Sequence, residues 1–446
     1  MRVGEGAGAA DVSDQYRYLS LYAPGGFVHP LRLSILRAAL PLAAALSACS
    51  DPSSPDGAPP VISSLPRQLT GQEAEMVTAA NSFGFNLLKE VNTSFADSNV
   101  FLSPLSASMA LGMTMNGAEG TTFTEMRSAL GFGPRSYEEL NTAYRSLITL
   151  LRELDPKVEF KIANAIYYDL ADIGAAVEQT FLDESRDYFD AEVKGLDFRI
   201  PSTVDTVNAW ASANTNGKIP TILDNIEAQI VMLLMNAIYF KGDWRAAFKT
   251  AETADLPFTA LRGVDVSVPT MHRKGGFRRA HVNNATVAEL PYGGDAFVMT
   301  ILLPDEGVNI NTFVAGLTAA TWQQATANLS DSDVDIYLPK FKLAWEDTLN
   351  DELKRLGMQQ AFVPDGAQFT RISRSLGNRL YIDFVKQKAF VDVNEIGTEA
   401  AAVTVVGIGL TSAPVPVQIN RPFVFAIRER LSGTVLFLGK IVEPKA

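Results

Sequence analysis

Residues 395–404 read Glu-Ile-Gly-Thr-Glu-Ala-Ala-Ala-Val-Thr, a run of small and acidic side chains close to the C-terminal end of a 446-residue chain. The three alanines suit a helix by intrinsic propensity. Glycine precedes them, however, and glycines and prolines follow, and these residues resist helix formation. We therefore do not expect a stable helix here. The residues that oppose one are Gly397, Gly407, Gly409, Pro414 and Pro416.

Read with the period of two of a β-strand, the same run gathers small side chains on one face. That face consists of Thr398, Ala400, Ala402, Thr404 and Val406. Its first members carry neither bulk nor charge, so they would not clash with strands on either side. The sequence therefore predicts an extended segment that can slide between two strands of a sheet.

The composition indicates one large folded domain. Apolar residues make up 47% of the chain, and no break in composition divides residues 67–446. Fifty acidic residues against 38 basic ones give a net charge of -12, which argues against nucleic acid or an anionic membrane surface as a partner. No apolar run reaches the ~20 residues that a transmembrane helix requires. We expect no membrane span.

The N-terminal region has the pattern of an export signal. Arg32 and Arg37 precede the Ala- and Leu-rich stretch 38–45, which ends in Leu-Ser-Ala-Cys at residues 46–49. Cys49 is the only cysteine. A lone cysteine is typically a buried thiol, but these four residues resemble the lipidation box of bacterial lipoproteins. The resemblance implies that Cys49 is acylated and that the protein is exported.

This reading divides the N-terminal region into two parts. Residues 1–48 would be an N-terminal extension and signal peptide, with the true start downstream of Met1, and the Pro- and Ser-rich residues 49–66 a solvated tether. The domain would then be anchored by lipid to the bacterial outer membrane, on its periplasmic or surface face, or be extracellular. With one cysteine it can form no internal disulfide.

Periodic patterns along residues 67–446 predict a mixed α+β order. Apolar residues recur at helical spacing from Gln72 onward, and Ser103-Pro104 is typical of an N-cap and first helical position. The other predicted helices are 105–115, 137–154, 204–214 and 345–356. The predicted strands are 158–168, 230–240, 286–290, 297–303, 334–338, 384–393, 423–427 and 434–442.

Residues suited to catalysis or metal binding are scarce. The histidines are His29, His272 and His281, and none accompanies a nucleophile, zinc or phosphate-binding motif. His272 and His281 lack an acid cluster nearby, so no metal site is predicted. A short basic cluster at residues 273–279 could bind a polyanion, although a solvated turn is the preferred reading. We predict no cofactor and no enzymatic activity.

Several separated segments together resemble the serpin family. Residues 99–106 look like the start of that family's central buried helix, and 236–244 like its long sheet strand and the turn beyond. The remaining matching blocks are Leu-Pro-Lys-Phe at 338–341, Lys-Ala-Phe-Val-Asp-Val-Asn-Glu at 388–395, Arg-Pro-Phe-Val-Phe at 421–425 and Phe-Leu-Gly-Lys-Ile at 437–441. The blocks occur in the family's order, so the chain is identified as a member.

The resemblance implies a serpin fold, α+β, in which one domain holds three β-sheets, eight to nine α-helices and an exposed reactive centre loop at about 395–417. It also implies a monomer that acts as a suicide substrate of a serine protease. The protease would cut the loop and form an acyl-enzyme, and the cut loop would then insert into the main sheet and distort the protease. The fold would be held kinetically rather than at equilibrium.

Under this resemblance the small residues become the hinge at which insertion starts. The hinge residues are Glu395, Gly397, Thr398, Glu399, Ala400, Ala401, Ala402 and Thr404. Thr398 would face inward and Glu399 outward, because burying an unpaired charge would stall insertion.

The family's loop length locates the scissile bond. It falls at Thr411-Ser412, with Leu410-Thr411 as second choice, and no Arg or Lys lies close to it. A protease of elastase-like or subtilisin-like specificity would accept Thr411, and a chymotrypsin-like one would accept Leu410.

The resemblance also assigns residues to the region where the sheet opens. These are Ser103, Ser106, Asn236, Trp244 and Gln387. The alternative is that they are ordinary core residues: a capping serine, a satisfied amide and a packed indole. Gln387 departs from the histidine that many serpins have there, so pH sensitivity is not expected from it.

Two other functions stay open on the sequence. A non-inhibitory serpin, acting as a binding or chaperone-like module, would have its loop cut as a plain substrate, and Gly407 and Gly409 favour it because they loosen the loop. An enzyme anchored as a surface lipoprotein is the second. Covalent trapping of a protease distinguishes the inhibitor from both.

Overall fold

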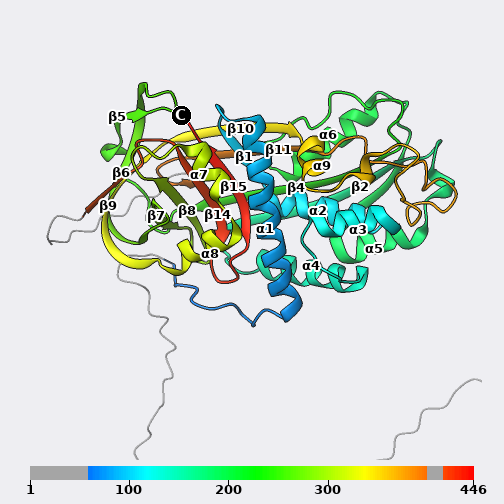
Figure 1. Cartoon of the computed structure of the whole chain (residues 1–446), viewed down its shortest axis with the longest axis horizontal. Coiled ribbons are helices and arrows are strands. Elements are labelled where there is room, and N and C mark those ends of the chain that lie inside the picture. The colour runs from blue at the N-terminus through cyan, green and yellow to red at the C-terminus, as the bar shows by residue number, and fades with distance from the viewer. Residues whose placement is uncertain (1–58, 399–414) are drawn as a thin grey trace, which may run out of the picture. The chain divides into compact units, whose positions relative to one another are not determined.

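The structure is a computed structural model that describes residues 59–398 and 415–446 (Figure 1). Cys49 and the hinge and bond residues from Glu399 to Ser412 lie outside these ranges. The described α-helices are α1 (Gly71–Ser94), α2 (Pro104–Met115), α3 (Gly120–Ala129), α4 (Tyr137–Arg152), α5 (Gln179–Phe189), α6 (Ser202–Asn214), α7 (Ile310–Gly316), α8 (Ala319–Ala327) and α9 (Asn350–Arg355).

The described strands alternate with these helices, as an α+β order requires. They are β1 (Val100–Leu102), β2 (Val158–Asp169), β3 (Ala191–Leu196), β4 (Met232–Asp243), β5 (Ala254–Thr259), β6 (Asp265–Val282), β7 (Ala285–Pro291), β8 (Phe297–Pro304), β9 (Ser330–Pro339), β10 (Phe341–Thr348), β11 (Lys386–Val393), β12 (Gly397–Thr398), β13 (Val415–Gln418), β14 (Phe423–Glu429) and β15 (Val435–Ile441).

The strands form the three sheets that the resemblance predicts. One sheet has six strands in the order β10-β11-β12-β4-β2-β3. The other two are continuous through the long strand β6, which gives the order β1-β15-β14-β8-β7-β6-β9-β13 with β5 also paired to β6. The small sheet consists of β5, the first half of β6, β9 and β13, because β6 pairs with β7 only from Arg278 onward.

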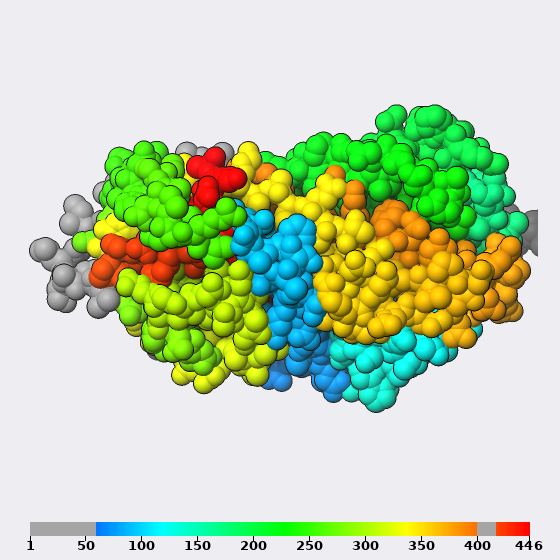
Figure 2. All heavy atoms as spheres, turned by 45° about the horizontal axis from the view of Figure 1, so that its top comes forward, coloured from blue at the N-terminus to red at the C-terminus, as the bar shows by residue number. Residues whose placement is uncertain are grey.

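Two N-caps fix the first helices where the sequence predicts them. Thr70 caps α1 in a capping box with Glu73, and Ser103 caps α2 by accepting a hydrogen bond from the Ser106 amide at 3.3 Å. Pro104 is the first residue of α2. Helix α2 is buried almost throughout, and α1 packs against it and crosses the surface between later segments of the chain (Figure 2). The resemblance's central buried helix is therefore α2.

The six-stranded sheet is covered on both faces, and the strand period shows which residues face which cover. Leu234 and Ile238 of β4 belong to the large core that includes α2, whereas Leu233 and Met235 belong to a smaller cluster with Val207 of α6. Even-numbered residues of β4 therefore point toward α2 and odd-numbered ones toward α6. The two helices lie on opposite faces of this strand.

One predicted element is wrong. The stretch 345–356 is not a single helix, because residues up to Thr348 belong to β10 and α9 spans only Asn350–Arg355. Trp345 pairs with Ala389 of β11 along an eight-residue antiparallel ladder. Residues 341–348 alternate between buried or half-buried and exposed side chains, and this period of two outweighs the helical propensity of Leu, Ala and Glu.

The end of the predicted tether lies on the domain. The Ile62 amide donates to the Gly294 carbonyl at 2.7 Å, and Arg430 Nη2 donates to the Ile62 carbonyl at 3.0 Å. Ile62 and Leu65 pack against the main core. Ile62 and Leu65, which the sequence assigns to the tether, therefore lie on the folded part.

Lys440 of β15 carries a buried ammonium that closes the C-terminal end of α1. Its Nζ lies 2.6–3.2 Å from four neutral oxygens, among which its three N–H groups are shared: Asn92 Oδ1, Asn311 Oδ1 and the carbonyls of Phe95 and Ala96. A cation at this end also complements the helix dipole. Burial nevertheless lowers the pKa of Lys440 to about 8.

This lowered pKa predicts a rise in stability at alkaline pH. Between the folded pKa of about 8 and the ordinary lysine pKa of 10.5, the unfolded chain binds a proton at Lys440 that the folded chain does not. The free energy of unfolding should therefore increase with pH over this window, by at most ~3 kcal/mol. Chemical unfolding at several pH values tests this, and K440M should lack this part of the slope. An equal slope in K440M would contradict the assignment.

Candidate functional site

The hinge begins inside the six-stranded sheet. Strand β12 lies between β11 and β4, with Thr398 opposite Val393 on one side and opposite Gly242 on the other. Thr398 is 3% exposed and faces inward, the orientation that the period of two predicts. Gly397 and Thr398 of the hinge therefore already lie in the sheet.

Gly397 is required by close backbone approach. A Cβ at this position would lie 2.1 Å from the Gly242 carbonyl oxygen and 2.7 Å from the Asp243 Cα. Neither contact can be relieved by moving a side chain, since both atoms belong to the backbone of β4. Any larger residue at position 397 would push β12 away from β4 and withdraw Thr398 from the sheet.

Tyr292 and Trp244 hold the entrance to this position. The Tyr292 hydroxyl and Thr398 Oγ1 are hydrogen-bonded at 2.6 Å, and the ring of Tyr292 stacks on Trp244 with centroids 4.4 Å apart. Burial raises the pKa of Tyr292, so its hydroxyl stays protonated. Trp244 Nε1 donates to the Asn394 carbonyl at 2.9 Å. Trp244 thus supports both the hinge and the turn that leads to it.

Glu395 anchors the same turn through its charge. Lys340 Nζ lies 2.9 Å from Glu395 Oε2, and Thr253 Oγ1 donates to Glu395 Oε1 at 2.9 Å. Burial alone would raise the pKa of Glu395, but the hydrogen bonds from Lys340, from backbone and from Thr253 outweigh it and lower the pKa below its usual value. The carboxylate is therefore ionised at neutral pH. It is held by Lys340, the residue that follows β9.

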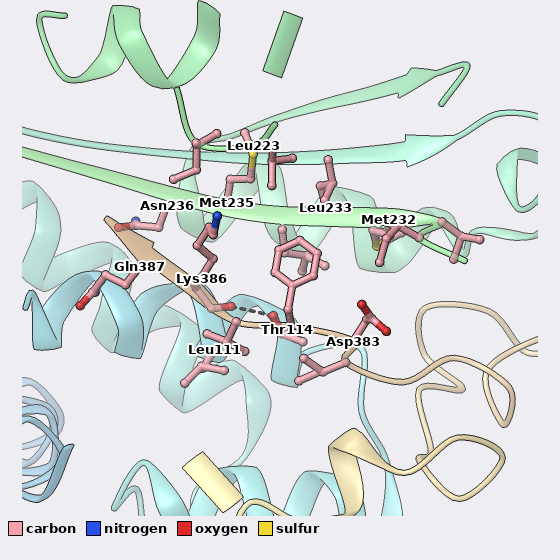
Figure 3. A pocket seen from close by; sticks show the side chains of 18 of the residues that line it. Leu111, Thr114, Leu223, Met232, Leu233, Met235, Asn236, Asp383, Lys386 and Gln387 are labelled. Carbon is pink, nitrogen blue, oxygen red and sulfur yellow. Dashed lines mark hydrogen bonds between the residues drawn. The ribbon is translucent and has the colours of Figure 1, made fainter. Parts of the chain in front are cut away.

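Below β12, the six-stranded sheet is open. Within the described residues no ladder joins β4 to β11 except through β12, and a cavity of about 400 Å3 lies between the two strands. Residues 232–238 of β4 line one side, and residues 379–388, which lead into β11, line the other (Figure 3). We call this cavity the slot. Ala107 and Ala110 of α2 contribute to its floor.

A polar cluster lies beside the slot at the N-terminus of α2. Gln387 Oε1 accepts from the Ser103 amide at 3.1 Å, and Gln387 Nε2 donates to the Ser103 carbonyl at 2.9 Å. Ser103 Oγ donates to the Leu436 carbonyl at 2.7 Å. Gln387 therefore ties β11 to the start of α2 with both of its amide groups, and Ser106 lines the slot next to it.

Asn236 faces the slot from the opposite strand with part of its amide unused. Its Nδ2 donates to Asn164 Oδ1 at 2.6 Å, whereas its Oδ1 is buried and has no hydrogen-bond partner. A buried acceptor without a partner costs about 1–3 kcal/mol. The slot thus has an unsatisfied acceptor halfway along β4.

Lys388, one of the basic residues that line the slot, contacts the segment that connects α6 to β4. Lys388 of β11 donates from Nζ to the Thr221 carbonyl at 2.9 Å, in the segment that connects α6 to β4. Lys218 of the same segment lies over the ring of Phe390, 5.2 Å from its centroid. These contacts hold the connection after α6 against β11.

The structure places the predicted opening residues in two groups. Ser103, Ser106, Asn236 and Gln387 lie around the slot, whereas Trp244 lies at the hinge. Sequence reasoning missed Tyr292, Asn164 and Thr253, because nothing local in the sequence marks their contacts. Lys340 stands in the quoted block Leu-Pro-Lys-Phe, but its pairing with Glu395 requires the fold.

The remaining candidates all lie on strand β6. His272 Nε2 is hydrogen-bonded to Asp335, and His281 Nε2 lies 3.0 Å from Asp305 Oδ1. Residues 273–279 form part of strand β6 rather than a turn, and Arg278 pairs with Asp295 at 2.6 Å. In residues 59–398 and 415–446 no three acidic, His or Cys side chains gather as a metal site. No helix in these ranges is long and apolar enough to cross a bilayer.

Comparison with known proteins identifies the family. Residues 78–444 match the family model described as "Serpin (serine protease inhibitor)". An uncharacterized serpin-like protein of Thermococcus kodakarensis is 34% identical over 84% of this chain and 87% of its own. The leukocyte elastase inhibitor of Sus scrofa is 33% identical over 83% of this chain and 100% of its own.

Solved structures agree with the sequence matches. The thermophilic serpin tengpin in its native state superposes with a TM-score of 0.75 at 31% identity, covering 84% of this chain and 95% of its own. Human thyroxine-binding globulin superposes with a TM-score of 0.76 at 28% identity, covering 84% of this chain and 100% of its own. The match spans the hinge, the slot and both large sheets, and the chain belongs to the serpin family.

Proposed function

We propose that this serpin inhibits a serine protease as a suicide substrate. The protease serine attacks the Thr411 carbonyl, Ser412 becomes the new N-terminus of the released C-terminal peptide, and the chain from Thr398 to Thr411 then enters the slot as a strand. The observation that carries the proposal is the combination of an open slot with a hinge in which Thr398 is already paired with a strand on each side.

The register of β12 supports insertion of the rest of the loop. If the antiparallel pairing of Gly397 with Asp243 and of Thr398 with Gly242 continues, Glu399 comes opposite Lys241, on the face toward α6. Opposite charges at directly paired positions stabilise a sheet. The alanines at 400 and 402 come opposite Phe240 and Ile238, on the face toward the core, where small side chains avoid a clash.

The same register sets Thr404 opposite Asn236. Thr404 would then face the core side, where Asn236 Oδ1 lacks a donor. T404V should remove the one hydroxyl that can satisfy this acceptor, and should destabilise the loop-inserted, cleaved form by about 1–3 kcal/mol. T404S serves as the matched control, since it keeps the hydroxyl.

This prediction is measured as the melting temperature of each variant after its loop has been cut. The native, uncut forms should melt alike. Equal melting temperatures of cut T404V and cut T404S would show that Thr404 does not reach Asn236.

Thr411 and the residues before it define the expected target. Threonine fills a small primary pocket, so proteases of elastase-like or subtilisin-like specificity are favoured, and cleavage after Leu410 would indicate a chymotrypsin-like target. Similarity to the leukocyte elastase inhibitor, a relative named for elastase, agrees with the first choice. Trypsin-like proteases are expected to leave the chain untrapped.

The test is covalent capture. The chain from Pro59 onward, which includes the packed residues Ile62 and Leu65, is mixed separately with elastase, subtilisin, chymotrypsin and trypsin and analysed on denaturing gels with mass spectrometry. We expect a detergent-resistant band at the summed mass less the peptide that begins at Ser412. Cleavage by every protease without such a band would overturn the proposal.

That negative outcome would favour the non-inhibitory alternative. Similarity to thyroxine-binding globulin, solved in complex with thyroxine, is the observation that keeps this alternative in view. A binding or chaperone-like serpin would have its loop cut as a plain substrate. Even then, the melting temperatures before and after loop cleavage would show whether the cut loop inserts into the slot.

The proposed site of action is the cell envelope. Cys49 and the export pattern before it support lipid anchoring at the bacterial outer membrane, with the domain outside the cytoplasm. Metabolic labelling with an alkyne fatty acid tests this, since the C49A variant should lose the label and appear in the soluble fraction. A labelled C49A variant would contradict lipidation at this residue.

A further inference from the structure

The methionines of the described chain divide sharply by exposure. Ten lie in residues 59–398 and 415–446, and eight of them are at most 3% exposed. The two that are partly exposed are Met232 and Met235, and both line the slot. The buried eight are Met76, Met109, Met113, Met115, Met126, Met271, Met299 and Met358.

The two partly exposed methionines lie on opposite faces of β4, at the strand edge where a strand would insert. Met232 is packed against the main core on the α2 side of β4, and Met235 against the cluster on the α6 side. Figure 3 shows both side chains along β4, opposite the segment that leads into β11. An oxidant that enters the slot therefore reaches sulfur on either face of the strand edge.

No competing thiol is present in the described part of the chain, because Cys49 lies outside it. Methionine is then the residue most readily oxidised there, and susceptibility follows exposure. We propose that Met232 and Met235 form a peroxide-sensitive modification site, and that their oxidation slows insertion of the cut loop. This proposal rests on the proposed function.

The chemistry needs only a hydroperoxide. A lone pair of the methionine sulfur attacks one peroxide oxygen, the O–O bond breaks, and the departing hydroxide takes up a proton to give water when hydrogen peroxide is the oxidant. The sulfur loses two electrons and becomes a sulfoxide, and the peroxide gains them. A sulfoxide reductase reverses the change.

The sulfoxide would interfere with insertion through its polarity. The residues around Met232 and Met235 are mainly apolar, and include Leu233 and Leu234 of the same strand. While the slot is open, the sulfoxide oxygen can bind water, but a strand that fills the slot strips this water away. Burying a polar group without a hydrogen bond is unfavourable, and we expect it to make insertion of the cut loop slower by about tenfold or more.

A slower insertion step changes the outcome of the reaction with a protease. The acyl-enzyme either is trapped by insertion or is hydrolysed, and hydrolysis releases active protease. Oxidation should therefore turn inhibitor into substrate, and the number of inhibitor molecules consumed per protease trapped should rise by about tenfold or more. Binding of the protease to the loop should not change.

The first measurement locates the modification. The purified full-length protein is treated with hydrogen peroxide. Peptide mass spectrometry then follows the formation of sulfoxide at each methionine over time. We expect Met232 and Met235 to react at least several-fold faster than Met358, which is 0% exposed. Equal rates at the three residues would overturn the site, whether or not the chain inhibits a protease.

The second measurement tests the consequence. The M232L/M235L variant keeps apolar side chains of similar volume, and peroxide should leave its trapping at the level of its own untreated sample. The natural chain and the M358L control should instead lose trapping after peroxide and regain it with sulfoxide reductase. Unchanged trapping by the oxidised natural chain would overturn the proposal.

If the untreated chain traps no protease, the proposed function fails, and the inference is decided by heating instead. Cutting the loop should raise the melting temperature of the untreated chain but not of the oxidised chain. An equal rise in both, or a rise in neither, would overturn the effect on insertion.

Discussion

Replacing Thr398 with arginine should abolish inhibition while leaving the loop cleavable. Thr398 is 3% exposed between β11 and β4, and its hydroxyl is bound to the Tyr292 hydroxyl at 2.6 Å. A guanidinium there has no carboxylate among the groups that contact Thr398, and an unpaired buried charge costs at least ~3 kcal/mol. The yield of covalent complex should fall at least about 100-fold, measured on denaturing gels with the preferred protease.

The matched control is T398S, which keeps the hydroxyl and removes only a methyl group. It should trap protease close to the natural level. The two variants should be cut at similar rates, since the bond at Thr411-Ser412 is distant in sequence from position 398. Full trapping by T398R would show that β12 does not lead the loop into the sheet.

Replacing Glu395 with lysine should lower the stability of the native, uncut form. Glu395 is 6% exposed, and the substitution removes its ion pair with Lys340 and places two ammonium groups together. Breaking a buried pair by removing one partner costs about 3–5 kcal/mol, and the lower end applies because the Lys340 side chain is 29% exposed. The melting temperature should fall by several degrees, and the chain should form oligomers on warming.

The oligomers follow from the position of the pair. Glu395 fixes the turn above β12, so its loss frees the hinge and leaves the slot open to the loop of a second copy. Size-exclusion chromatography after mild heating measures this. E395Q, which keeps an acceptor for Thr253 Oγ1, should be intermediate. A monomeric E395K with an unchanged melting temperature would remove Glu395 from the opening mechanism.

The pH dependence of this pair has a defined sign. The folded-state pKa of Glu395 lies below the ordinary glutamate pKa of 4.5, so the unfolded chain takes up a proton first as pH falls. The contribution of the pair is therefore complete above pH 4.5 and declines as pH falls through the folded pKa. Acid should thus loosen the natural hinge, as E395K does at neutral pH.

The sequence predicts much of the fold because its local signals and the family blocks coincide. Ser103-Pro104 starts α2, and the apolar run that ends at Leu303 forms β8. The period of two in residues 398–406 predicted that Thr398 faces inward, which the structure bears out for the hinge residues that it describes. The roles of the other loop residues stay predictions.

The parts that could not be predicted depend on contacts between distant segments. Tyr292 meets Thr398 across 106 positions of sequence, and Lys440 meets Asn92 across 348. No local period encodes such pairs, since they arise when separate strands meet. The false helix at 345–356 has the same origin, because the ladder with β11 decides the conformation of residues 341–348.

The contact of Ile62 with Gly294 has a mechanical consequence. Gly294 lies in the turn between β7 and β8, two residues after Tyr292, and the Ile62 amide bonds to its carbonyl. A pull on the chain before Pro59 is therefore borne first by this turn and by Arg430, and only then by α1. Tension would act on Tyr292, which is hydrogen-bonded to Thr398. The hinge would then be held less tightly in the sheet when the domain is under tension than when it is relaxed.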